Sequence, residues 1–464
     1  MTGPPHWRRR WQLARSTYSG RRQLRQRPGL WKKAQTLFFD MKICILSTST
    51  TAHTLGGTEI QAEALAAEAS RLGHSVLVLT SASPAGLERE MKDGYEVRYL
   101  SGTHHSMTRH WVEPWYRESA AAIARLRAEK KIDVVWAENF SGLSYARLPP
   151  KDRAPLISIA NGLAIRGELS SHYKALSGPA DLAYFLTFYA AQLLFYYIPW
   201  FRAMARDSDL IAAVSRETAE AFESELPDSR GKTEVMYNPV DCSHFHPDPE
   251  LRRRARKELG IAPESVVILM AGVMHRQKGM HIGLTAFAEL AAQNPGALLL
   301  MAGDGPERPG LENIATRAGL SGRVRFLGLL PNSGMPYFYN AADIYLNPTT
   351  RAEGFGIVNA EAMACALPCI ISRTGGTAST IDDAESGYFS EPGDAASIAG
   401  PLLRLAGDSA LRADFGRTGR AKAVKIFDKK VVVGRYIEAS ERLLTARSAR
   451  QGTTAADKSV EDGF

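Results

Sequence analysis

The stretch DIYLNPTTRAEGFGIVNAEAMACALPCIIS (residues 343–372) places an amphipathic segment between two short apolar runs. The runs DIYLN (343–347) and PCIIS (368–372) have the length and the β-branched content of buried strands. A Gly-Phe-Gly turn at 354–356 follows the first run, and the residues after it are long enough for a helix. The stretch therefore predicts a strand, a helix and a second strand, which is the repeating unit of a parallel sheet.

Similar units repeat along the chain from Met41 onward. Because 464 residues exceed what a single core usually supports, we expect two domains with a cleft between them. The predicted fold class is α/β, with two Rossmann-like, doubly wound parallel-sheet domains. The strands expected in the first domain are 42–48, 75–80, 132–136, 155–160 and 209–215, and those expected in the second are 265–272, 297–303, 323–328, 343–347 and 368–372.

Composition shifts suggest where the domains begin and end. The prolines and charge clusters of YNPVDCSHFHPDPELRRRARKELG, from residue 237, mark a linker. We expect a basic, disordered extension at 1–40, a first domain at 41–236, a linker at 237–262, a second domain at 263–427, a final helix at 428–447 and a disordered tail at 448–464.

The net positive charge is local. Residues 1–40 hold ten of the 57 Lys and Arg residues and one of the 49 acids, so the remainder, with 47 basic and 48 acidic residues, is near neutral. Nucleic acid is therefore not an expected partner. The segment is either an extension upstream of a start at Met41 or a basic, tryptophan-bearing arm for anionic lipid. Four cysteines without zinc spacing favour a reducing cytosol.

Residues 182–201, LAYFLTFYAAQLLFYYIPWF, form an uncharged run that is long enough to span a bilayer. A crossing there would separate strands of one sheet, so a span is disfavoured. Two interpretations stay open: a buried or dimer-forming helix, and a helix in the membrane interface whose tyrosine and tryptophan rings lie at the headgroups. In the second case, Arg202 and Arg206 would meet lipid phosphates.

The two glutamates of the opening stretch are candidate ligand-binding groups. Glu353 lies in the loop and Glu361 about one turn into the following helix, so both carboxylates can face one crevice. A carboxylate accepts two hydrogen bonds, which suits the vicinal diol of a ribose or hexose. The alternative is that acids near a helix start only complement its dipole. The absence of G-x-G-x-x-G and Walker A sequences disfavours a nicotinamide dehydrogenase or a P-loop NTPase.

The wider pattern resembles the retaining glycosyltransferases of family 4, which have the GT-B fold. The resemblance rests on GGTEIQAEALAAEASRLGHSVLVLT (56–80), NPVD (238–241), QKG (277–279), GDGP (303–306), VRFLG (324–328) and EGFGIVNAEAMACALPCI (353–370), in that order. It implies a nucleotide-sugar donor in the second domain, an acceptor on the side of the first, and a final helix that crosses back to the first domain.

The resemblance also implies roles for residues. Lys278 would neutralise the diphosphate. Lys278 and Glu353 are the expected catalytic residues. Glu361 would hold the ribose. The remaining donor-side groups would be the backbone amides of Gly354, Phe355 and Gly356 beside Glu353, and those of Gly56 and Gly57 from the first domain.

Three positions depart from the family pattern. Val273 stands where the family often has an arginine, and Arg276 in the same loop is a candidate replacement on the donor diphosphate. Asn161 stands where a histidine commonly faces the acceptor, so it is the acceptor-side candidate; an amide orients a hydroxyl but is no strong base. Ser379 replaces a common glutamate.

We therefore expect a retaining hexosyltransferase that uses a nucleotide sugar and no further cofactor or metal. Asp207-Ser208-Asp209 has the D-x-D spacing of metal-dependent transferases but no nucleotide loop beside it. The expected acceptor is a polysaccharide or a lipid-linked glycan such as a lipopolysaccharide precursor, reached in the cytoplasm at the inner membrane face. The alternatives are transfer to a small soluble acceptor and a non-catalytic nucleotide-sugar-binding subunit.

Overall fold

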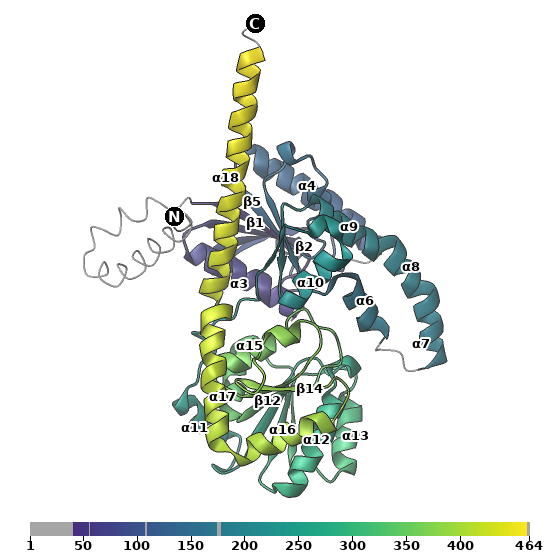
Figure 1. Cartoon of the computed structure of the whole chain (residues 1–464), viewed down its shortest axis with the longest axis vertical. Coiled ribbons are helices and arrows are strands. Elements are labelled where there is room, and N and C mark those ends of the chain that lie inside the picture. The colour runs from purple at the N-terminus through teal and green to yellow at the C-terminus, as the bar shows by residue number, and fades with distance from the viewer. Residues whose placement is uncertain (1–39, 55, 107–108, 174–177, 462–464) are drawn as a thin grey trace, which may run out of the picture. The chain divides into compact units, whose positions relative to one another are not determined.

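The computed structural model describes residues 40–54, 56–106, 109–173 and 178–461. Expectations for residues 1–39, including the basic extension, lie outside this range. The chain divides into two compact units, Met1–Met41 and Lys42–Phe464, and the second unit contains both predicted sheets (Figure 1). The predicted α/β class with two parallel sheets is therefore confirmed.

The first sheet has eight strands in the order β3-β4-β2-β1-β5-β6-β7-β8, and every neighbouring pair is parallel except β3 with β4. Five of the strands are those expected from the sequence. The strands β3, β4 and β8 were not predicted. The bounds are β1 Lys42–Leu46, β2 Ser75–Ser81, β3 Arg89–Lys92, β4 Tyr95–Leu100, β5 Val134–Glu138, β6 Leu156–Ala160, β7 Leu210–Ala213 and β8 Thr233–Val235.

Helices connect these strands. The longest are α3, which follows β1, and α4, which precedes β5. The helices of this half are α3 Gly57–Arg71, α4 Arg109–Ala128, α5 Leu143–Ala146, α6 Ala164–Tyr173, α7 Pro179–Tyr184, α8 Ala190–Gln192, α9 Ile198–Asp207 and α10 Arg216–Glu225.

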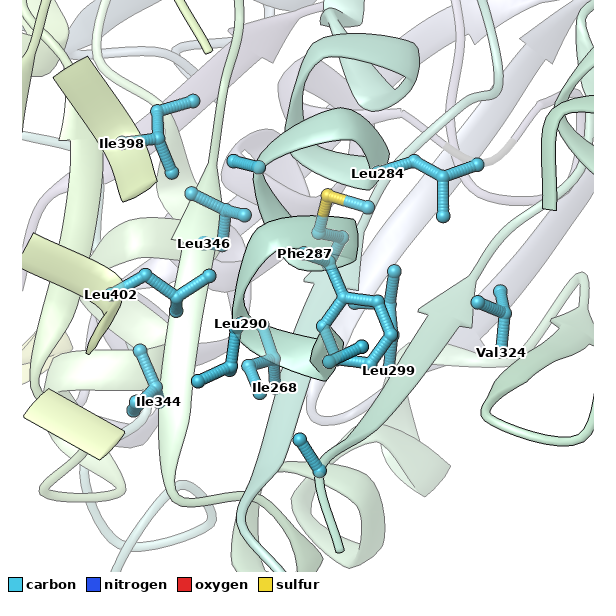
Figure 2. Close-up of a cluster of buried hydrophobic side chains, with 14 of the residues drawn as sticks. Ile268, Leu284, Phe287, Leu290, Leu299, Val324, Ile344, Leu346, Ile398 and Leu402 are labelled. Carbon is cyan, nitrogen blue, oxygen red and sulfur yellow. The ribbon is translucent and has the colours of Figure 1, made fainter. Parts of the chain in front are cut away.

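The second sheet has six parallel strands in the order β11-β10-β9-β12-β13-β14. Apolar side chains from α12 and α16 pack against its strands, and Figure 2 shows Phe287 and Leu290 beside Ile268 and Leu299. The strand β14 was not predicted. The strand bounds are β9 Val267–Ala271, β10 Leu298–Ala302, β11 Val324–Gly328, β12 Ile344–Asn347, β13 Cys369–Ser372 and β14 Gly387–Ser390; the helices are α11 Pro249–Glu258, α12 Met280–Gln293, α13 Arg308–Arg317, α14 Met335–Ala341, α15 Ile357–Ala364, α16 Ala396–Gly407, α17 Ser409–Lys422 and α18 Lys429–Glu461.

The predicted linker at 237–262 contains the helix α11. Asp248 caps it by accepting hydrogen bonds from the amides of Glu250 and Leu251, and Arg252 and Arg256 on the helix both form ion pairs with Asp343 at the start of β12. A cluster of arginines that looked like solvated linker is in fact a helix anchored to the second sheet.

The final helix α18 runs to Glu461, past the predicted end at 447, so the expectation of disorder from 448 is wrong for residues 448–461. No proline interrupts this part of the chain, which removes the strongest signal for a helix end. Near its start the helix contacts the first sheet. The Trp136 indole on β5 donates a hydrogen bond to Ser440 Oγ over 3.0 Å, and its ring packs on Tyr436.

Residues 179–207 form a continuous helical segment in which π-helical turns at 185–189 and 193–197 join α7, α8 and α9. The alternative of a buried helix is wrong here, because Leu186, Phe188 and Phe195 are 63%, 52% and 69% exposed. Of the described helices, the one at Leu182–Asp207 is long and apolar enough to cross a membrane, and little of it is buried in the protein. The strands that flank it, β6 and β7, pair in parallel, so a single crossing would break the sheet.

The strand orders indicate where a ligand binds. In the first sheet the connections reverse direction between β1 and β5, and in the second they reverse between β9 and β12. Open α/β sheets bind ligands outside the carboxyl ends of the strands at such a switch point.

Candidate active site between the two sheets

A cavity of ≈ 390 Å³ lies at both switch points. Its walls come from the loops that follow strands of the first sheet and from the loops after β9, β10, β11 and β12 of the second. The predicted site residues that line it are Gly56, Gly57, Asn161, Lys278, Glu353, Gly354, Phe355, Gly356 and Glu361. The structure therefore brings together all of the predicted residues except Arg276.

Lys278 and Glu353 form an ion pair in this cavity, with 2.7 Å between Lys278 Nζ and Glu353 Oε1. Burial opposes ionisation of the Glu353 carboxyl, but Lys278 together with Thr349 and Arg351 outweighs this effect, so the pKa of Glu353 is lowered. The lysine side chain is 30% exposed and that of the glutamate 12%. The ammonium is thus held from one side and remains open to the cavity on the other.

Glu361 is engaged by two protein groups that the sequence interpretation did not include. Its Oε1 accepts a hydrogen bond from Asn332 Nδ2 over 3.0 Å, and its Oε2 accepts one from Tyr339 Oη over 2.9 Å. Burial raises the pKa of Glu361 to about 7, although both hydrogen bonds act to lower it. Asn332 also lines the cavity, so it is placed to contact the same ligand group as Glu361.

The loop between Glu353 and α15 depends on two glycines. Gly356 precedes the helix with φ 82°, a left-handed conformation that favours glycine. At Gly354, an added Cβ would lie 2.0 Å from the carbonyl oxygen of Asn161, so only glycine lets this loop touch the first half of the chain. The Phe355 ring turns away from solvent and packs on Tyr237 and Phe427, which leaves its backbone to address a ligand.

Two helix N-termini lie close together at the cavity. The helix α3 begins at Gly57 and α15 begins at Ile357, and a Cβ on Gly57 would lie 3.9 Å from Ile357 Cγ2. Each N-terminus presents unpaired backbone N–H groups and a partial positive charge, which favours an anion such as a diphosphate.

Arg276 lies apart from this arrangement. It lines a separate hollow with His281 and Thr350, because Arg276 and Lys278 are two residues apart on one 3₁₀ turn and so point in different directions. The cavity contains another guanidinium instead, that of Arg351, which sequence reasoning passed over. The available signal was its position two residues before Glu353 in the same loop.

The D-x-D sequence has structural partners. Asp209 Oδ2 accepts hydrogen bonds from the Arg153 guanidinium and from the amide of Leu156, and Asp207 pairs with Arg206. These carboxylates hold the start of β6 and the end of α9 rather than facing the cavity.

Two family models match the chain. The one described as Glycosyltransferase Family 4 covers residues 55–244, and the one described as Glycosyl transferases group 1 covers residues 252–422. Together they cover the residues that line the cavity and every strand of the two sheets except β1. They agree with the family resemblance of the sequence motifs.

Individual proteins give a consistent result. The chain is 30% identical over 256 residues to the GDP-mannose-dependent alpha-(1-6)-phosphatidylinositol monomannoside mannosyltransferase of Mycolicibacterium smegmatis, a match that covers 54% of this chain and 66% of that protein. For three such curated relatives the matched part spans between 52% and 66% of their length.

Solved structures show the same fold. Sucrose-phosphate synthase from Thermosynechococcus elongatus superposes with a TM-score of 0.72 at 21% identity, over 87% of this chain and 99% of that one. Anabaena Alr3699/HepE in complex with UDP-glucose superposes with a TM-score of 0.65 at 23% identity, over 87% and 99%.

Proposed function

Because the chain belongs to glycosyltransferase family 4, we propose that it transfers a hexose from a nucleotide sugar, with retention of the anomeric configuration. The acceptor is a polysaccharide or a lipid-linked glycan at the cytosolic face of a membrane. The observation that carries this proposal is the pairing of Lys278 with Glu353 beside the N-termini of α3 and α15, all in one cavity.

The charges of the cavity suit the leaving group of this reaction. Transfer from a nucleotide sugar places negative charge on a diphosphate, and cations and N–H groups already in position stabilise that charge most as it develops. Lys278 and Arg351 supply the cations, and the two helix N-termini supply N–H groups. Glu353 orients the lysine and accepts hydrogen bonds from the donor sugar, while Glu361 with Asn332 holds the ribose diol.

Neither a metal nor a further cofactor is part of the proposal. The positive groups of the protein take the place that a divalent cation has in other transferases. Retention follows from a front-face displacement in which the leaving phosphate assists the incoming hydroxyl. Activity is therefore expected to persist in EDTA, and a strict requirement for manganese would contradict this part.

The segment 182–201 supports a membrane-bound acceptor. It carries no Asp, Glu, Lys or Arg, and several of its large apolar side chains are exposed, namely Leu182, Tyr184, Leu186, Phe188, Leu194 and Phe195. Aromatic rings and aliphatic side chains of this kind favour the boundary between headgroups and acyl chains. Arg202 follows the apolar run and is exposed, whereas Arg206 is already paired with Asp207.

A thermal-shift screen with UDP- and GDP-linked hexoses tests the donor assignment. A ligand at one hundred times its dissociation constant stabilises the folded state by about 2.7 kcal/mol, which is readily detected. The nucleotide sugar that stabilises the protein is then incubated with lipid-linked and with soluble acceptors, and NMR of the product reports its anomeric configuration. Stabilisation without any hydrolysis or transfer would instead identify a non-catalytic binding subunit.

A further inference from the structure

Asn161 reaches the cavity from the end of β6, and a buried acid beside it controls how its amide is oriented. The neighbouring strand β5 ends at Glu138, which is paired with Ile159 in the register of the sheet. Asn161 Nδ2 donates a hydrogen bond to Glu138 Oε2 over 2.6 Å. The backbone amide of Asn161 donates to Asn139 Oδ1 over 3.2 Å, so the residue is held through both its main chain and its side chain.

This hydrogen bond fixes which end of the Asn161 amide faces the cavity. Since Nδ2 is directed at Glu138, the amide oxygen Oδ1 is the atom of Asn161 that remains to accept a hydrogen bond. Glu138 itself is 3% exposed and does not line the cavity, and its Oε1 finds no hydrogen-bond partner among the described residues. A buried carboxyl oxygen without a hydrogen-bond partner lowers the stability of the folded state. Its presence therefore calls for a functional explanation.

We propose that Glu138 is a positioning residue that turns the Asn161 amide so that its oxygen accepts a hydrogen bond from a sugar hydroxyl in the cavity. The inference rests on the proposed glycosyl transfer. The backbone carbonyl oxygen of Asn161 lies against Gly354 of the loop between Glu353 and α15. The Asn161 side chain is therefore placed where the two halves of the site meet. A hydroxyl held there is fixed against the loop that addresses the donor sugar.

The orientation depends on the protonation state of Glu138. An ionised carboxylate only accepts hydrogen bonds, so it admits one amide orientation, whereas a neutral carboxyl can also donate to a flipped amide. Burial raises the pKa of Glu138 to about 8, and the charge of Glu59 on α3 raises it further, against the effect of the Asn161 hydrogen bond. Tyr436 of α18 also interacts electrostatically with Glu138.

A double-mutant cycle tests whether Glu138 acts through Asn161. Turnover numbers are measured for the parent and for E138L, N161A and E138L/N161A. We expect E138L to lower kcat at least tenfold with little change in KM for the donor, and to have no added effect when N161A is present. Additive losses, or an unchanged kcat in E138L, would overturn the proposal. Glu68→Gln is the matched control, because this buried glutamate pairs with Arg71 and does not line the cavity.

The pH dependence of kcat provides a second test, because a purely structural role of Glu138 would not change it. In E138Q the side chain permits both amide orientations at every pH, as the neutral acid does. We therefore expect kcat of the parent to rise at least twofold between pH 6.5 and 9, and E138Q to stay at the low-pH level. A rise of equal size in E138Q would refute the role. Failure of the parent to turn over any nucleotide sugar would count against the proposed function, whereas parental turnover with additive losses counts against Glu138 alone.

Discussion

Replacing Lys278 by alanine removes the cation that we propose to face the leaving diphosphate, and it leaves the Glu353 carboxylate without its ion-pair partner. Loss of one preorganised contact to transition-state charge typically costs about 3 kcal/mol, so we expect kcat to fall at least about 100-fold. Steady-state kinetics with the identified donor measures this. The double variant Lys278→Ala, Glu353→Gln restores the local charge balance, and we expect it to recover stability but not turnover.

A control for the lysine substitution is Lys422→Ala. Lys422 also pairs with a carboxylate of the second half, that of Asp382, but this pair does not line the cavity. Because the Asp382 side chain is 48% exposed and the pair lies outside the cavity, its loss is expected to leave kcat within a factor of two. An undiminished rate in Lys278→Ala would remove the diphosphate role.

The ionisation of Glu361 predicts how donor binding depends on pH. Because burial raises its pKa to about 7, the carboxylate that can accept hydrogen bonds from both ribose hydroxyls is present above that pH and is lost below it. The affinity for the nucleotide sugar should fall as the pH is lowered from 8 to 6, approaching tenfold per pH unit. Calorimetry measures this with the intact sugar diphosphate, whose phosphates do not titrate in that window.

Two variants isolate the contribution of Glu361. Glu361→Gln cannot ionise, so its affinity should stay near the value that the parent has at pH 6 throughout the range. Glu361→Ala should weaken binding at every pH. Equal donor affinity in Glu361→Ala and the parent would refute the ribose role, and a pH dependence that persists in Glu361→Gln would assign the titration to another group.

At the scale of elements, the loop before α15 has no room for a side chain at Gly354. A Cβ there would lie 2.0 Å from the carbonyl oxygen of Asn161, so the loop or the first half must move. We expect Gly354→Ala to reduce the free energy of unfolding by about 1–3 kcal/mol and to abolish most turnover, as overpacked sites do. Denaturant unfolding and kinetics measure the two effects.

The matched control lies in the helix α13. A Cβ at Gly310 meets no described atom within 4 Å, and alanine is favoured over glycine within a helix by roughly 0.5–1 kcal/mol. Gly310→Ala should therefore stabilise the protein slightly and leave turnover unchanged. If both glycine variants behaved alike, the close contact between the donor loop and Asn161 would not matter for the site.

The elements that sequence reasoning found and those that it missed differ in their burial. The runs that became β1, β5, β9 and β13 are mostly apolar, with polar residues only at their ends, as is typical of strands covered on both faces. They were predicted within two residues of their observed starts. The strands β3 and β4 have the charged sequences REMK and YEVRYL; β3 is the edge strand of the sheet and β4 lies next to it. Such strands depend on tertiary pairing, which a single sequence does not display.

The site was predicted in the same uneven way. Glu353, Glu361 and the glycines between them lie close together in the chain, so their spacing allowed a shared crevice, and the wider motif pattern favoured it over a purely structural role at the helix start. Asn332 lines the cavity, and Tyr339 and Glu138 contact Glu361 and Asn161 from other elements, so only the fold brings these residues together. Arg276 lines a separate hollow rather than the cavity, for a local reason, the direction of one 3₁₀ turn.

At the scale of the whole molecule, the exposed apolar run at 182–201 needs something to cover it. A second copy of the chain or a membrane could cover it. We favour the membrane, since the run is uncharged, rich in tyrosine and phenylalanine, and followed by the exposed Arg202. Arg206 and Trp200 contribute less than the sequence suggests. The arginine is paired with Asp207, and the tryptophan packs on Phe140.

The test is binding to vesicles of anionic phospholipid. Changing Leu186, Phe188 and Phe195 together to serine should release the protein into the supernatant, because each methylene-sized group that enters the acyl boundary contributes on the order of 0.8 kcal/mol. These side chains are more than half exposed, so circular dichroism and the melting temperature should stay at parental values. Deletion of residues 1–40 should leave binding intact, and high salt should weaken it only slightly, since Arg202 is worth about 1 kcal/mol on anionic lipid.

The control variant, Leu87→Ser with Met91→Ser, removes two other exposed apolar side chains outside the run and should bind as the parent does. If the truncated parent stays in the supernatant and sediments as a dimer that the triple variant splits, the run is a subunit interface, and the proposed lipid-linked acceptor loses its main support.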